Sequence, residues 1–139
     1  MEFAALNRVL CNLVDNASRF AADQSVTLYV VPVNTHGAYT NLRFAVVNKL
    51  DSFQKKILQE HYGNNLHFLF AGGFTTDGSG LGMSICADFV TDSYGLSCNE
   101  EAADHGYFGA RLLGDYFAVW FHWPGRQLTE RNQPSSDAA

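Results

Sequence analysis

Residues 72–85 have the sequence GGFTTDGSGLGMSI, in which glycines and small hydroxyl residues lead directly into an apolar segment. Glycine lets the backbone approach an anion closely, and the free amides at the start of a helix carry a partial positive charge. A helix that begins near Gly80 would therefore aim its N–H groups at a phosphate. Gly-rich turns also precede helices without binding anything, so this stretch alone leaves both interpretations open.

Residues 6–20 have the spacing of an amphipathic helix, whose apolar face would hold Leu6, Val9, Leu10, Leu13, Ala17 and Phe20. Asn12, Asn16 and Arg19 lie side by side along the edge of that face. Carboxamide oxygens can ligate Mg²⁺, and a guanidinium can pair with phosphate oxygens. The pattern therefore suits a metal-bound polyphosphate. The alternative is a polar helix edge that binds nothing.

Two motifs together resemble a known superfamily. Residues 12–20, NLVDNASRF, resemble the N-box in the ATP-binding catalytic domain of sensor histidine kinases, the GHKL superfamily that includes gyrase B, Hsp90 and MutL. Residues 78–85, GSGLGMSI, resemble the G2 box of the same family, which closes the ATP lid. Residues 116–124 resemble the strand ending in proline that closes such domains. The resemblance covers about residues 3–125.

The resemblance implies an α+β fold, the two-layer α/β sandwich known as the Bergerat or GHKL ATP-binding fold. In this fold a mixed, mostly antiparallel sheet is covered on one face by about three helices, and the nucleotide cleft lies between the helices and the lid. Residue patterns along the chain predict matching elements. Besides the first helix, we expect helices at residues 53–62 and 81–94 and strands at residues 25–33, 42–48, 96–99, 107–113 and 115–123.

Several of these elements carry local signals of their own. Residues 25–33 and 42–48 should pair as an antiparallel hairpin. Gly95 is a plausible end for the helix at 81–94. Residues 63–77 would form a lid, with Leu66, Phe68, Leu69 and Phe70 as its apolar anchor.

Composition fits one domain. The chain has 139 residues, 47% of them apolar, and a formal net charge of −5, which is enough for a single core. We expect a catalytic domain at residues 1–125 and a polar, disordered tail at 126–139. No apolar run is long enough to span a membrane and no signal peptide opens the chain, which predicts a cytoplasmic protein. The acidic balance argues against a nucleic-acid partner.

The cysteines and histidines show no spacing typical of a metal site. Cys11, Cys86 and Cys98 are odd in number and lack a CxxC pair, so we expect buried, reduced thiols. None of the five histidines is followed directly by Asp or Glu. The resemblance would require that acidic neighbour for a phosphoacceptor histidine.

The resemblance assigns roles residue by residue. Asn16 would be the Mg²⁺ ligand, and Asn12 would help to position the metal or its water. Arg19 would meet the phosphates, whereas Phe20 would either border the nucleotide or belong to the core. The lid and the following helix would supply the remaining ATP contacts, at Thr75, Thr76, Gly78, Ser79, Gly80, Leu81 and Gly82.

The main departure from the family lies at the G1 box, normally Asp-x-Gly-x-Gly, whose aspartate accepts a hydrogen bond from the adenine amino group. This chain has Asn48 in place of the aspartate, and Leu50 and Ser52 in place of the glycines. The amide oxygen of Asn48 could still accept that hydrogen bond. The Cβ atoms of Leu50 and Ser52 could crowd the base pocket or prevent the required turn.

The resemblance implies the Mg-ATP-binding catalytic domain of a two-component sensor histidine kinase. Such a domain would transfer the γ-phosphoryl of ATP to a histidine on a helical hairpin, in the same or another chain, and a response regulator would be the next partner. The chain would then be an excised catalytic domain or a stand-alone relative. The alternative is a degenerate domain that has lost ATP and docks a response regulator or kinase, as in histidine phosphotransferases. An anti-sigma-factor serine kinase fits less well, because its G1 box is normally intact.

Overall fold

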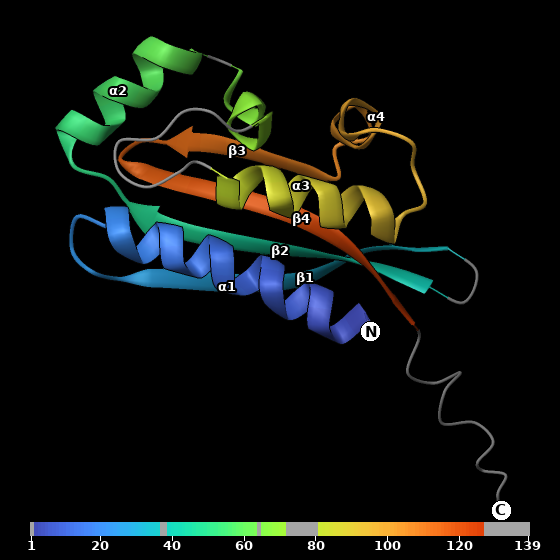
Figure 1. The fold of residues 1–139 in the computed structure, drawn as a ribbon. Helices are drawn as coiled ribbons and strands as arrows, with labels where there is room; N and C mark the ends of the chain where they lie inside the picture. The colour runs from blue at the N-terminus through green and yellow to red at the C-terminus, as the bar shows by residue number, and fades with distance from the viewer. Residues whose placement is uncertain (1, 37–38, 64, 72–80, 127–139) are drawn as a thin grey trace, which may run out of the picture.

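The computed structural model describes residues 2–36, 39–63, 65–71 and 81–126 (Figure 1). Helices and strands follow one another along the chain as α1 (Glu2–Phe20), β1 (Val26–His36), β2 (Tyr39–Lys49), α2 (Ser52–Tyr62), the 3-10 helix η1 (Leu66–Ala71), α3 (Leu81–Ser93), α4 (Asn99–Asp104), β3 (Phe108–Leu113) and β4 (Tyr116–Arg126).

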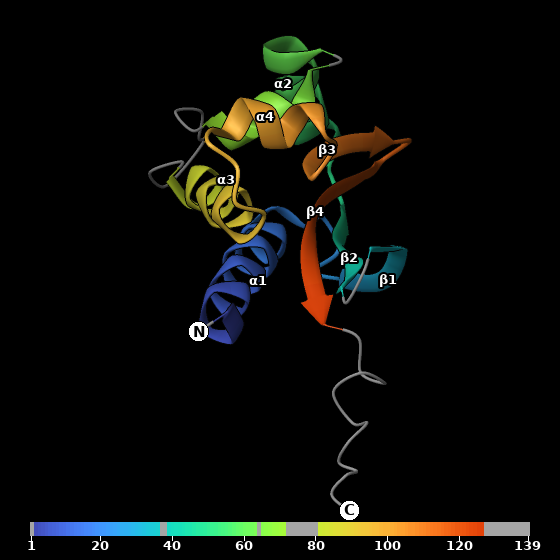
Figure 2. The ribbon, with the colours of Figure 1, turned by 90° about the vertical axis from the view of Figure 1, so that its right-hand side faces the viewer.

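The four described strands form one sheet in the order β1-β2-β4-β3, and every neighbouring pair is antiparallel. The predicted hairpin is present, since β1 pairs with β2 along its length. Helices α1 and α3 lie on one side of the sheet (Figure 2). The architecture is therefore α+β, as expected for the GHKL-type fold.

The core lies between the sheet and these helices. Alternate residues of β2 point toward the helices, so that Phe44 and Val46 are buried there. Phe44 stacks on Phe121 of β4, its partner in the strand register, with ring centroids 5.1 Å apart. Helix α1 covers them with the predicted apolar face, of which Val9, Leu13 and Ala17 are buried and Leu6, Leu10 and Phe20 are partly buried.

The predicted strand at residues 96–99 is wrong, because this segment caps helices instead. Gly95 adopts a φ of 69°, and its N–H and that of Leu96 bond back to carbonyls of α3. This is how a left-handed residue closes a helix. The backbone N–H and Oγ of Ser97 both donate to Glu101 Oε1, at 3.2 and 3.1 Å. Those contacts start α4 immediately, which leaves no length for a strand.

A second hydrophobic cluster lies at the end of the sheet beneath α2 and η1. Leu50, Leu58 and Leu66 are buried in it. The carboxylate of Asp51 accepts a hydrogen bond from the Gln54 N–H at 2.8 Å and so caps the N-terminus of α2. Of the predicted lid, residues 66–71 form η1, and Phe70 is buried in the main core.

Three further expectations concern the cysteines, the C-terminal tail and membrane-spanning helices. All three cysteines are free, but only Cys86 is buried, so the expectation of burial is wrong for the exposed Cys11 and Cys98. The predicted tail lies outside the described residues, apart from Arg126. Among the described helices, none has both the length and the apolar character required to span a membrane.

Candidate functional site

Helices α1 and α3 pack against each other and run in opposite directions (Figure 1). The thiol of Cys86 on α3 donates to the carbonyl oxygen of Val9 on α1, at 3.8 Å. The side chain of Asn12, on the next turn of α1, also hydrogen-bonds to the Cys86 thiol. Asn12 therefore faces α3.

Asn16 lies one turn further along α1, toward the start of α3. It is seven residues beyond Val9, and Leu81 is five residues before Cys86. At a rise of about 1.5 Å per residue, Asn16 is about 10 Å beyond the Val9–Cys86 contact and the start of α3 about 8 Å beyond it. The partly buried Asn16 is thus level with the first turn of α3.

The last two predicted residues of α1 have separate environments. Arg19 is exposed and forms an ion pair one turn back, from Nη2 to Asp15 Oδ2 at 3.1 Å. Phe20 packs against the second hydrophobic cluster beside Leu50 and Leu58. The structure thus gives Phe20 a place in the core.

Asn48 lies on β2, on the face of the sheet that the helices cover. It pairs in register with Val26 and Phe117, and only 3% of the residue is exposed. Its Nδ2 donates to the carbonyl of Lys49 at 3.3 Å. No described residue donates a hydrogen bond to its Oδ1. An amide oxygen can accept a hydrogen bond from a ligand.

The end of β2 and the end of α1 are held together. The backbone N–H of Ala22 donates to the carbonyl of Lys49 at 2.7 Å. Asn48 therefore lies beneath the C-terminal half of α1, on the same side of the sheet as Asn16.

The two positions that replace the family's glycines belong to the adjoining helix and core. Leu50 is 4% exposed and packs with Leu58 and Leu66. Ser52 is the first residue of α2. Because the Leu50 side chain is held in the second cluster, it lies among residues of α2 and η1.

The predicted lid contacts fall largely outside the described residues. This holds for Thr75, Thr76, Gly78, Ser79 and Gly80. Leu81 and Gly82 form the first turn of α3. Backbone amides in a first turn have no acceptor within the helix, so these two residues have the backbone setting that an anion site requires.

The residues gathered here are suited to binding a ligand. Burial raises the pKa of the Cys86 thiol to about 12, although the hydrogen bond from Asn12 lowers it, so the thiol stays protonated at neutral pH. Among the described residues, no three His, Cys, Asp or Glu side chains come together as a metal cluster. Carboxamide oxygens suit Mg²⁺, which needs few protein ligands and keeps several waters. The Asn12–Cys86 contact was not foreseen, because nothing in either helix's own pattern specifies its partner.

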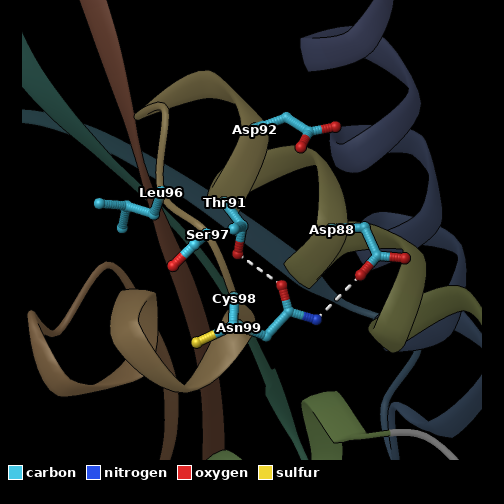
Figure 3. Close-up of a pocket in the computed structure, with 7 residues that line it drawn as sticks. All are labelled: Asp88, Thr91, Asp92, Leu96, Ser97, Cys98 and Asn99. Atoms are coloured by element: carbon cyan, nitrogen blue, oxygen red, sulfur yellow. Dashed lines mark hydrogen bonds between the residues drawn. The ribbon is translucent and has the colours of Figure 1, made fainter.

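A hollow of about 390 Å³ lies at the C-terminal end of α3, where the chain turns into α4 (Figure 3). Asn99 lies between two residues of α3: its Nδ2 donates to Asp88 Oδ1 at 2.8 Å, and its Oδ1 accepts from Thr91 Oγ1 at 2.5 Å. These polar groups satisfy one another. The arrangement braces α4 against α3 and leaves little for a ligand to bind.

Comparison with known protein families gives one match. The model of a family described as histidine kinase-, DNA gyrase B-, and HSP90-like ATPase matches residues 2–126. That range includes α1, the end of β2 and the start of α3, which carry the candidate site residues described above. No individual characterised protein matches the chain at a significant level.

Proposed function

Since the chain belongs to the family of histidine kinase-, DNA gyrase B-, and HSP90-like ATPases, we propose that it is the Mg-ATP-binding catalytic domain of a two-component sensor histidine kinase. An ATP-binding domain of the GHKL type follows from the family itself. Phosphotransfer to histidine, and the residues that serve it, belong to the proposal. In it, residues 1–125 form the catalytic domain and act in the cytoplasm.

The observation that carries the proposal is the position of the Asn12–Asn16 edge of α1 beside the first turn of α3. Asn12 contacts Cys86 on α3, and Asn16 is level with the helix start. A carboxamide oxygen and the amides of a helix N-terminus then lie at the same level of two packed helices, which suits a metal-bound triphosphate.

Each candidate residue has a role in the proposed site. Asn16 ligates the metal through its amide oxygen, and Asn12 orients Asn16 or a metal-bound water. The amides of Leu81 and Gly82 hydrogen-bond to phosphate oxygens. Asn48 Oδ1 accepts a hydrogen bond from the adenine amino group. Mg²⁺, when bound, neutralises negative charge on the phosphates. Positioning and charge neutralisation account for most of the catalysis in phosphoryl transfer.

The phosphoacceptor would be supplied by another segment. No histidine here precedes an acidic residue, and the buried Cys86 thiol is no nucleophile at neutral pH. The proposal therefore needs a histidine-bearing helical hairpin, in the same or another chain, and a response regulator that receives the phosphoryl group.

Calorimetric titration of ATP, with and without Mg²⁺, tests the site. We expect a Kd between micromolar and millimolar, or roughly −8 to −4 kcal/mol. Asn16→Ala should remove most of the Mg²⁺-dependent affinity. Asn7→Ala is the matched control, because Asn7 lies exposed on the same helix and should bind ATP as the unmodified chain does.

A second candidate function has one observation in its favour. Leu50 fills a buried position where the family has a glycine, as expected of a degenerate domain that docks a response regulator or kinase without ATP. If saturating millimolar nucleotide gives no heat, no shift in melting temperature and no amide perturbation in α1 or α3, the docking function replaces the kinase function.

Phosphotransfer needs its own measurement. Incubated alone with γ-labelled ATP, residues 1–139 should take up no acid-labile phosphate. Labelling should appear on the hairpin when the cognate histidine-bearing segment is added. Strong self-labelling of the isolated chain would contradict this division of roles.

A further inference from the structure

The strands of the sheet differ from the rest of the chain in charge. None of β1, β2, β3 and β4 contains an Asp or a Glu, although the chain has 14 acidic residues. The strands do contain four cationic residues, Arg43, Lys49, Arg111 and Arg126. The sheet is therefore the basic part of a protein whose formal net charge is −5.

Strand register places three of these cations on the face opposite the helices, here called the outer face. Alternate residues share a face, and Phe44 and Val46 point toward α1 and α3. Arg43 and Lys49 thus point the other way, as does Arg111, whose register partner is Ala118. No described helix covers this face (Figure 2).

The outer face is also apolar between its cations. Its exposed apolar residues come from β1, β3 and β4: Tyr29 (54% exposed), Val31 (45%), Leu113 (55%) and Tyr116 (49%). Large apolar side chains exposed together on one face often mark a binding surface. Tyrosine, tryptophan and arginine are the residue types enriched in interfaces between proteins.

Trp120 is fixed in the middle of this face. A Cβ atom on Gly109 would come within 2.4 Å of the indole Cζ2, so the ring lies directly over the glycine backbone. The Arg43 guanidinium lies 5.3 Å from the ring centroid on the same face. Arg43 Nε bonds to His122, and no described residue accepts from its terminal nitrogens. The outer face therefore presents the Trp120 ring with the Arg43 guanidinium beside it.

We propose that the outer face docks an acidic, amphipathic helix of a partner protein. The helix would place apolar side chains on Trp120 and Tyr29, and its carboxylates would pair with Arg43, Lys49 and Arg111. Charge complementarity selects this occupant, because the face carries three cations and its strands carry no anion. A second copy of the chain docked through its own outer face would bring like charges together. The proposal goes beyond ATP binding, which involves the opposite side of the sheet.

Two synthetic peptides test the proposal on the whole chain. Both are about five helical turns long with a leucine face, and their polar positions are all Glu in one and all Lys in the other. Amide NMR shifts are recorded during titration at low salt. We expect the Glu peptide to shift the amides of outer-face residues and the Lys peptide to shift none. Rising salt should weaken binding.

Charge reversal locates the contact. Arg111→Glu, at an exposed position of β3, should weaken binding of the Glu peptide by about tenfold, the scale of a contact that reverses from attraction to repulsion. Arg8→Glu is the matched control, since Arg8 is exposed on α1, and it should change the affinity less than about twofold. Neither variant touches the residues proposed to bind ATP.

Five outcomes would overturn the proposal. The Glu peptide at millimolar concentration produces no outer-face shifts, or both peptides bind equally. Arg8→Glu weakens binding as much as Arg111→Glu does. The outer face binds vesicles of anionic phosphatidylglycerol but not the Glu peptide, which would make it a lipid surface. Finally, sedimentation shows that it joins two copies of the chain and excludes the peptide.

Discussion

Arg43 donates a hydrogen bond from Nε to Nε2 of His122, at 3.0 Å, across the pair formed by β2 and β4. The accepting nitrogen must carry no proton, so the contact requires neutral histidine. Burial, together with the neighbouring Arg43 charge, lowers the pKa of His122 to about 4. Tyr107 packs against the same ring, with centroids 5.9 Å apart. The Arg43–His122 contact therefore links the protonation of His122 to folding.

The first prediction is a loss of stability in acid that depends on His122. Its pKa is about 6.5 in the unfolded chain and about 4 when folded. Between these values the unfolded state binds more protons, so the free energy of unfolding falls as the pH drops from about 6.5 to 4. His122 should account for up to about 3 kcal/mol of this loss. Urea unfolding at several pH values measures it.

His122→Gln is the control, because Gln offers Arg43 an acceptor that does not titrate. The carboxylates of the chain contribute the same acid sensitivity to both proteins. The difference between the two pH profiles therefore belongs to His122. Parallel profiles from pH 7 to pH 4 would contradict the prediction.

The second prediction concerns the close contact between Gly109 and Trp120. Gly109→Ala places a Cβ atom 2.4 Å from the indole Cζ2, so the ring must move. Overpacking of this kind costs about 1–3 kcal/mol of unfolding free energy. In a double-mutant cycle with Trp120→Leu, most of the cost should disappear, because the smaller side chain makes room. An alanine penalty that persists in the Trp120→Leu background would assign the effect to the backbone.

Local pattern was sufficient for much of the fold. The apolar spacing of α1 predicts its buried face correctly, because Val9, Leu13 and Ala17 recur at helical intervals. Gly95 ends α3 because its φ of 69° suits glycine. The segment before α4 could not be predicted this way. Its course depends on the hydrogen bonds of Ser97 to Glu101, which compete with strand formation.

The candidate site was likewise predictable from local sequence only in part. Asn12 and Asn16 share a helix, so periodicity alone places them together. Their distance from α3 depends on the packing of two helices, and the contact of Asn12 with Cys86 has no local signal. The outer face also needs the sheet, because only strand pairing brings Arg43 beside Trp120 and His122.

The third prediction tests whether Leu50 blocks the base pocket. Leu50→Ala should lower the free energy of unfolding by about 2–4 kcal/mol, because the side chain is buried with Leu58 and Leu66. ATP affinity should remain unchanged, since the methyl groups belong to the second cluster. Leu58→Ala removes a similar buried side chain from the same cluster and is the matched control. An increase in ATP affinity specific to Leu50→Ala would mean that Leu50 does crowd the nucleotide.

The last prediction concerns Asn48, which is 3% exposed and whose Nδ2 donates to the carbonyl of Lys49. If this oxygen accepts the adenine amino group, Asn48→Asp should keep or tighten ATP binding, because a charged acceptor makes the stronger hydrogen bond. Asn48→Leu should abolish discrimination between ATP and GTP. If Asn48 only ends a strand, both changes leave nucleotide binding alone, and the buried Asp costs several kcal/mol of stability. Parallel ATP and GTP titrations of both variants, with melting curves, separate these cases. Equal discrimination in the unmodified chain and Asn48→Leu would remove Asn48 from the site.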